Sequence, residues 1–126
     1  MNVLLDTCAL LALASGSLPR RAAAALRRAP EAYVSVVSPW EIAIKAAVGR
    51  LRLRDTPFGW YAGVVEHHAL REVSLDADLA CAAAALPPLH RDPFDRVIVA
   101  LAQARAVPVL TSDENIARYP GVRTLW

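Results

Sequence analysis

Residues 3–17, VLLDTCALLALASGS, form the stretch whose pattern of local structure decides the fold. The apolar residues 3–5 are typical of a short buried strand, and the run ends at an acid, Asp6. Residues 9–13 have the composition of a helix, and the Ser-Gly-Ser sequence at 15–17 ends it. The stretch therefore predicts a strand followed by a helix, with an acidic side chain at the junction.

The same alternation of strand and helix patterns continues along the chain. The clearest helix begins at the Asp-Pro pair of residues 92–93, because the apolar residues from Phe94 to Leu101 follow the i, i+3, i+4, i+7 spacing. Strands that alternate with helices favour an α/β layer structure with a mainly parallel sheet. Further helices are predicted over residues 19–29, 39–49, 57–68 and 76–86, and further strands near residues 32–37, 70–75, 107–110 and 122–125.

Length and composition predict a single domain over residues 1–126, with one core. The hydrophobic fraction of 56% and the mean hydropathy of +0.31 favour apolar surface left for a partner, so an oligomer is expected rather than a monomer. No apolar run reaches the roughly 18 residues that a membrane helix needs, and the first residues do not resemble a secretory signal. We therefore expect a cytoplasmic location, with Cys8 and Cys81 reduced and in or near the core.

The formal net charge is only +2, so its distribution is more informative than its size. If four of the 12 acids shared one pocket, the rest of the molecule would carry 14 basic residues and only 8 acidic ones. Such a surface would attract a phosphate backbone. The alternative is a compositional bias, because arginine is used almost to the exclusion of lysine and alanine is abundant. Both interpretations stay open.

Each candidate acid also has a purely structural explanation. Residues 38–41, Ser-Pro-Trp-Glu, match a capping signature, with Ser38 as N-cap and Glu41 either completing the capping box or pairing with Lys45. Asp92 precedes Pro93 as another N-cap, with Asp95 in the first turn, and Asp113 precedes a short helical segment in the same way. Acids at these positions stabilise a helix N-terminus by about 0.3–1 kcal/mol each.

Taken jointly, the acids favour a functional site. Asp6 and Asp113 follow predicted strands directly, and Glu41 follows one within a few residues, so all three fall where parallel sheets bind ligands. Converging carboxylates repel one another unless a cation neutralises them, and hard oxygen ligands favour Mg²⁺ or Mn²⁺ over zinc. Phosphodiester hydrolysis is the chemistry that such a centre suits. We assign Asp6 and Asp95 as direct metal ligands, with Glu41 and Asp113 holding water, orienting the nucleophile or completing a second metal site.

Three blocks of sequence identify a family: residues 4–7 (LLDT), 38–45 (SPWEIAIK) followed by Gly49-Arg50-Leu51, and 90–96 (HRDPFDR). Together with residues 110–113 (LTSD), their order and spacing resemble PIN-domain ribonucleases, specifically the VapC-like toxins of bacterial toxin–antitoxin pairs. The resemblance covers nearly the whole chain, from Asp6 to Asp113. It implies a PIN-like three-layer α/β/α sandwich with a mainly parallel central sheet of four to five strands.

The same resemblance implies an activity and partners. It implies an endoribonuclease dependent on Mg²⁺ or Mn²⁺ that cleaves an RNA substrate, a homodimer, and a small cognate antitoxin that inserts a segment into or beside the active site. The acidic quartet would be Asp6, Glu41, Asp95 and Asp113. Thr7, and Thr111 or Ser112, would be hydroxyl helpers, and Asp92 would cap its helix in a supporting role.

Two features of these motifs need separate treatment. Many relatives read Asp-Thr-His-Ala at the first motif, whereas this chain has Cys8 in place of the histidine, and no set of Cys and His residues has the spacing of a structural zinc site. His90, Arg91 and Arg96 flank the acids and are candidates for contact with RNA phosphate or the antitoxin, although solvated charge around a turn explains them equally well.

Other functions stay open at this point. An aspartyl-phosphate phosphatase would need a second Asp and a Thr after Asp6, and residues 6–10 are Asp-Thr-Cys-Ala-Leu. A catalytically silent PIN fold that binds RNA or a protein is one alternative to the toxin, and a DNA nuclease of related fold is another.

Overall fold

The computed structural model describes residues 1–126, and its centre is a five-stranded sheet. The strand order is β3-β2-β1-β4-β5, and every neighbouring pair is parallel. The predicted α/β class, with a mainly parallel sheet of four to five strands, is therefore confirmed. The strands are β1 (Val3–Leu5), β2 (Ala32–Ser35), β3 (Arg71–Val73), β4 (Val109–Leu110) and β5 (Thr124–Leu125).

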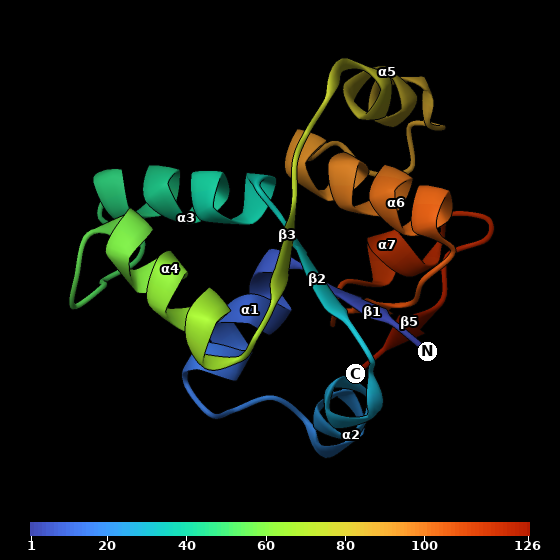
Figure 1. Ribbon diagram of the computed structural model, residues 1–126. Helices are drawn as coiled ribbons and strands as arrows, with labels where there is room; N and C mark the ends of the chain where they lie inside the picture. The colour runs from blue at the N-terminus through green and yellow to red at the C-terminus, as the bar shows by residue number, and fades with distance from the viewer.

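Helices cover both faces of this sheet and connect its strands (Figure 1). No helix combines the length and apolar character needed to cross a membrane. The helices are α1 (Thr7–Ala14), α2 (Arg20–Arg28), α3 (Val37–Ala47), α4 (Pro57–His67), α5 (Ala77–Ala85), α6 (Pro93–Arg105) and α7 (Glu114–Ala117).

The central strand β1 divides the core into two halves, because successive side chains of a strand point to opposite faces. Leu4 packs into one cluster with residues of α5, α6 and α7. Val3 and Leu5 pack into the other, with residues of α1, α2, α3 and α4. Figure 1 shows α5, α6 and α7 on one side of the sheet and α1, α2 and α4 on the other, which gives three layers. All three residues of β1 are at most 1% exposed, so the strand is held by apolar burial from both sides.

The start of α3 differs from the sequence prediction. We expected Ser38 to be the N-cap, but α3 begins at Val37, and Ser38 is a fully buried residue of its first turn. The hydroxyl of Ser35, the last residue of β2, accepts the hydrogen bond from the Val37 backbone N–H, so the strand leads almost directly into the helix. Ser38 and Glu41 therefore form no capping box, which leaves the Glu41 carboxylate free for other contacts.

The two cysteines also differ from expectation. Cys8 and Cys81 are free, as predicted, but both are exposed rather than in or near the core. Cys8 lies on α1 between the buried residues Thr7 and Ala9, and successive helix positions face different directions. Cys81 lies on α5, where only Ala83 is buried.

The link between α5 and α6, residues 86–92, is fixed by the side chain of Arg96. Its guanidinium donates hydrogen bonds to four backbone carbonyl oxygens and to the Tyr119 hydroxyl; the carbonyls belong to Ala84, Leu86, Pro87 and His90, at 2.8–3.2 Å. The Tyr119 hydroxyl in turn donates to Pro87 and accepts from the His90 backbone N–H. These contacts fix the path of the chain into α6 and give Arg96 a structural role, while its contact with RNA or the antitoxin stays a prediction.

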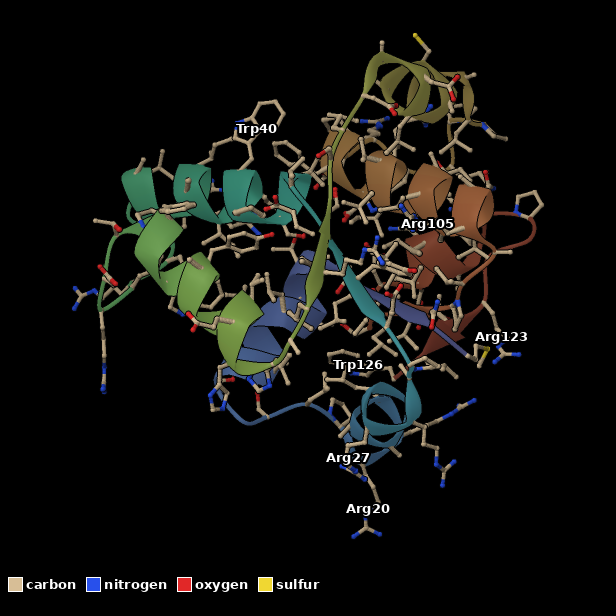
Figure 2. All side chains as sticks on the ribbon, viewed as in Figure 1. Arg20, Arg27, Trp40, Arg105, Arg123 and Trp126 are labelled. Carbon is tan, nitrogen blue, oxygen red and sulfur yellow. The ribbon has the colours of Figure 1, made fainter.

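We predict that Arg96→Lys lowers the free energy of unfolding by about 2 kcal/mol, because a hydrogen bond to a charged donor contributes about 1.5–3 kcal/mol and an ammonium cannot span all five acceptors. Thermal unfolding measures this as a fall in Tm of about 7 °C. The matched control is Arg27→Lys, because Arg27 points outward from α2 (Figure 2) and is exposed. Equal Tm values for the two variants would contradict the assignment.

Candidate active site

The structure brings the four predicted acids to one pocket of about 460 Å³. Because the strands are parallel, the carboxyl ends of β1, β2 and β4 lie at the same edge of the sheet, and the pocket lies beyond that edge. Asp6 follows β1, Asp113 follows β4, and helices α3 and α6 bring Glu41 and Asp95 from either side. Thr7, Cys8, Leu11, Lys45 and Ser112 complete the lining.

Asp6 is the most deeply buried of the acids, with 3% of its surface exposed. It is the N-cap of α1, and one carboxylate oxygen accepts the backbone N–H of Ala9 at 2.8 Å. The other oxygen accepts a short hydrogen bond from the hydroxyl of Thr111. Burial raises the pKa of Asp6 to about 6, against the lowering effect of these two hydrogen bonds and with added repulsion from Asp113 and Glu41.

The predicted hydroxyl residues occupy different positions around Asp6. Thr111 joins two strand ends, because its oxygen donates to Asp6 and also accepts the Asp113 backbone N–H at 2.9 Å. Thr7 is buried and donates to Ser38 at 3.0 Å, which ties α1 to α3. Ser112 is exposed, with its hydroxyl 3.5 Å from the Cys8 sulfur. Of the two hydroxyls left open by the sequence, Thr111 is therefore the one that contacts an acid of the quartet.

Asp95 lies in the first turn of α6, two residues after the helix begins at Pro93. Asp92 caps this helix as predicted, because its carboxylate accepts the Phe94 backbone N–H at 2.9 Å. Burial raises the pKa of Asp95 to about 7, and the negative charges of Asp92, Glu41 and Asp113 add to the rise while His90 opposes it. A carboxyl whose pKa lies near 7 in a pocket of acids marks a candidate functional site.

His90 is a member of the site that the sequence analysis assigned differently, as a contact for RNA or the antitoxin. Its Nε2 atom lies 2.9 Å from an oxygen of Asp113 and 3.0 Å from an oxygen of Asp95. Its Nδ1 atom accepts the Asp92 backbone N–H at 3.2 Å, which leaves the ring proton on Nε2, facing the two acids. This direction of the His90 ring could not be predicted from the sequence, because His90 belongs to a link without secondary structure.

Glu41 and Lys45 form the other wall of the pocket. The Lys45 ammonium lies 2.8 Å from one carboxylate oxygen of Glu41, so the predicted pair is confirmed. This hydrogen bond raises the pKa of Lys45, which keeps the ammonium charged. The other oxygen of Glu41 is buried and has no hydrogen-bond partner. Lys45 lines the pocket itself, a position that the sequence analysis had not assigned to it.

These residues fit a divalent cation. A carboxylate oxygen of Asp95 and one of Asp113 lie within 4.8 Å of each other, and the Glu41 oxygen without a hydrogen-bond partner is a further acceptor. Most of the available ligand atoms are carboxylate oxygens, which suit Mg²⁺ or Mn²⁺, and Cys8 is the only thiol in the lining. Arg91 is exposed beside this group, outside the pocket itself.

Comparison with known proteins identifies the family. The model of the PIN domain matches residues 3–122, which is nearly the whole chain. Over 112 residues the chain is 31% identical to Ribonuclease VapC22 from Mycobacterium tuberculosis (strain ATCC 25618 / H37Rv), covering 86% of this chain and 85% of that protein.

Solved structures share the fold. VapBC2 from Rickettsia felis, bound to a DNA fragment from its promoter, superposes with a TM-score of 0.70 at 13% identity, over 98% of this chain and 97% of the other. FitAB bound to an IR36 DNA fragment gives 0.64 at 18% identity, over 97% and 92%. PAE2754 from Pyrobaculum aerophilum gives 0.61 at 15% identity, over 98% and 89%. With a family model over almost every residue and a relative above 30% identity, the chain belongs to the PIN-domain family, among its VapC-like members.

Proposed function

We propose that this protein is an endoribonuclease dependent on Mg²⁺ or Mn²⁺ and acts as the toxin of a toxin–antitoxin pair. The observation that carries the proposal is that four acids line one pocket: Asp6, Glu41, Asp95 and Asp113. The pKa values of Asp6 and Asp95 are raised there to about 6 and about 7. The 31% identity to Ribonuclease VapC22 supports RNA as the substrate.

The residues divide into cation ligands and groups that position them. Asp6 and Asp95 are the direct ligands in this proposal, and Asp113 and Glu41 hold water or complete the site. Thr111 and the Ala9 backbone N–H fix the orientation of the Asp6 carboxylate from two sides. His90 holds the Asp95 and Asp113 carboxylates together through Nε2. Such fixed orientation places charge without reorganisation during the reaction.

The reaction is hydrolysis of a phosphodiester by water. A bound divalent cation supplies a Lewis acid that polarises the phosphate and makes water acidic enough to attack near neutral pH. Glu41 lines the pocket, and its carboxylate is our candidate for accepting a proton from water there. The Lys45 ammonium lines the same pocket and provides positive charge for a phosphate oxygen.

The partners follow from the family. We propose a cognate small antitoxin and a homodimer, with residues 1–126 as a single PIN domain in the cytoplasm. Two of the solved structures with this fold are VapBC2 and FitAB, which supports the antitoxin partner. Exposed apolar side chains on α3 and α4 provide surface for a protein partner; they include Trp40 at 55% and Phe58 at 76% exposure.

We predict that purified, antitoxin-free protein cleaves RNA in the presence of Mg²⁺ or Mn²⁺ and that EDTA abolishes this cleavage. Asp95→Asn and Asp6→Asn are each expected to reduce kcat/KM by about 100-fold or more, because losing a preorganised charge at a reacting centre costs about 3–4 kcal/mol. The measurement is cleavage of a mixed RNA panel by variants whose folding is verified by circular dichroism.

The control for this experiment is Asp78→Asn, which removes an exposed acid on α5 outside the pocket and should leave cleavage unchanged. DNA substrates of matched sequence test the alternative function of a DNA nuclease. Cleavage of DNA but not RNA would move the assignment to a DNA nuclease, and RNA binding without any cleavage would move it to a catalytically silent PIN fold.

A second prediction concerns stability in the absence of metal. A carboxyl whose pKa is higher in the folded than in the unfolded chain binds more protons when folded, so acid stabilises it. With the pKa values of Asp6 at about 6 and Asp95 at about 7, their contribution is fully present below about pH 4 and is lost as the pH rises to about 7. At pH 7.5, Asp95→Asn should therefore raise the Tm of metal-free protein by about 5 °C.

Thermal unfolding in EDTA and in Mn²⁺, at pH 5 and pH 7.5, tests this. Mn²⁺ should raise the Tm of the wild type at pH 7.5 and have much less effect on Asp95→Asn, because the cation replaces the missing protons. Glu66→Gln, an exposed acid of α4, is the control. A lower Tm for Asp95→Asn than for wild type in EDTA at pH 7.5 would show that the carboxylate stabilises the metal-free fold.

A further inference from the structure

A second hollow, of about 420 Å³, adjoins the pocket of the four acids. Glu41 and Lys45 line both, so the two hollows are neighbours. The second hollow adds residues of three kinds. Arg50 and Arg91 provide positive charge, Asp92 is an acid, and the apolar surface comes from Ile44, Val48, Pro93 and Phe94.

The position of Arg50 is set by the way α3 ends. Gly49 adopts a left-handed backbone with φ of 77°, its N–H bonds to the Ala46 carbonyl, and the Arg50 N–H returns to the Lys45 carbonyl at 2.9 Å. This is the Schellman pattern, in which a glycine reverses the chain direction. It keeps Arg50 beside the last turn of α3 rather than letting the loop carry it away from Lys45.

Arg91 reaches the same hollow from the other side, on the link that precedes α6. Both arginines are exposed and neither forms an ion pair within the chain. The two acids that also line the hollow are already engaged, Glu41 with Lys45 and Asp92 with the Phe94 backbone N–H. The guanidinium groups are therefore available for an external anion.

The apolar part of the hollow is unusually open for such side chains. Val48 is 64% exposed and Ile44 is 43% exposed. The Phe94 ring is partly buried and meets Trp40 edge-on, with the ring centres 4.9 Å apart. An aromatic side chain beside two unpaired arginines is the combination that binds single-stranded nucleic acid, because bases stack on rings and phosphates pair with guanidinium groups.

We propose that this hollow binds the nucleotide next to the scissile phosphate of single-stranded RNA. Arg50 and Arg91 contact the neighbouring backbone phosphate, and the base lies against Phe94 and Val48. The inference rests on the proposed ribonuclease function, since the shared wall of Glu41 and Lys45 links the hollow to the pocket of the reaction. It names a path for the substrate strand that the four acids alone do not determine.

Binding of a short fluorescein-labelled single-stranded RNA of mixed sequence tests the proposal. Fluorescence anisotropy is measured in Mn²⁺ with Asp95→Asn protein, which keeps the RNA intact, over a series of salt concentrations. Adding Arg50→Ala or Arg91→Ala should weaken binding about fivefold and flatten the slope of log Kd against log salt by about 0.7, the value for one phosphate contact in single-stranded nucleic acid. Adding Phe94→Leu should weaken binding by a similar factor with an unchanged salt slope, because stacking involves no ion release.

The matched control is Arg27→Ala. Arg27 is an exposed arginine that points outward from α2 (Figure 2), and it lines neither hollow. Its removal changes the net charge equally and should alter Kd by less than about twofold. In the catalytically intact protein, Arg50→Ala should raise KM and leave kcat within about twofold, since the lost contact is present in the ground state and the transition state alike.

The outcomes separate this inference from the function on which it rests. Equal losses of RNA affinity for Arg50→Ala and Arg27→Ala would contradict the proposed binding site but leave the ribonuclease function intact. The same holds if neither Arg50→Ala nor Arg91→Ala weakens binding while the wild type cleaves RNA. RNA binding that depends on Arg50 in a protein that cleaves nothing would support the hollow as an RNA-binding site and contradict the proposed ribonuclease activity. Unchanged RNA binding with an altered mass in light scattering would assign the hollow to a second copy of the chain.

Discussion

Burial of like charges at one edge of a parallel sheet is the constraint on which the site depends. Four strand connections bring carboxylates to the same place, and the raised pKa values of Asp6 and Asp95 show that this arrangement opposes folding near neutral pH. The chain limits the cost with a few nearby donors. Thr111 donates a hydrogen bond to Asp6, and Lys45 pairs with Glu41. His90 contacts Asp95 and Asp113 together.

The stability that offsets this repulsion comes from elsewhere in the molecule. The strand β1, which ends at Asp6, is buried on both faces, so it contributes apolar burial to both halves of the core. On the other wall, Arg96 fixes the link that carries His90 and Asp92, through hydrogen bonds that avoid the acids altogether. The acids are thus held by a rigid frame whose interactions do not depend on the charge state of the pocket.

Local patterns in the sequence predicted the frame better than the contacts within the site. Asp6 could be predicted because a parallel strand that ends at an acid allows few positions for it, and Asp95 because the motif at residues 90–96 resembles that of a family. Ser38 was placed wrongly, because the Ser-Pro-Trp-Glu pattern resembles a capping box and the competing hydroxyl of Ser35 lies in the preceding strand. The direction of His90 depends on a contact with Tyr119, which is 29 residues away, and on Arg96 in the next helix, so it cannot be inferred from local spacing.

The charge arrangement also explains how an acidic pocket is compatible with an anionic substrate. A cation among the carboxylates removes the repulsion only at the pocket itself, within a distance that salt screens to about 8–10 Å. Phosphates farther along a strand need their own positive partners, and lysine is scarce, since Lys45 is the only lysine among 14 basic residues. Lys45 is paired inside the pocket, whereas Arg50 and Arg91 are unpaired just beyond it. A bound cation would therefore neutralise the pocket itself, and Arg50 and Arg91 would provide positive charge for the next phosphates of an extended RNA strand.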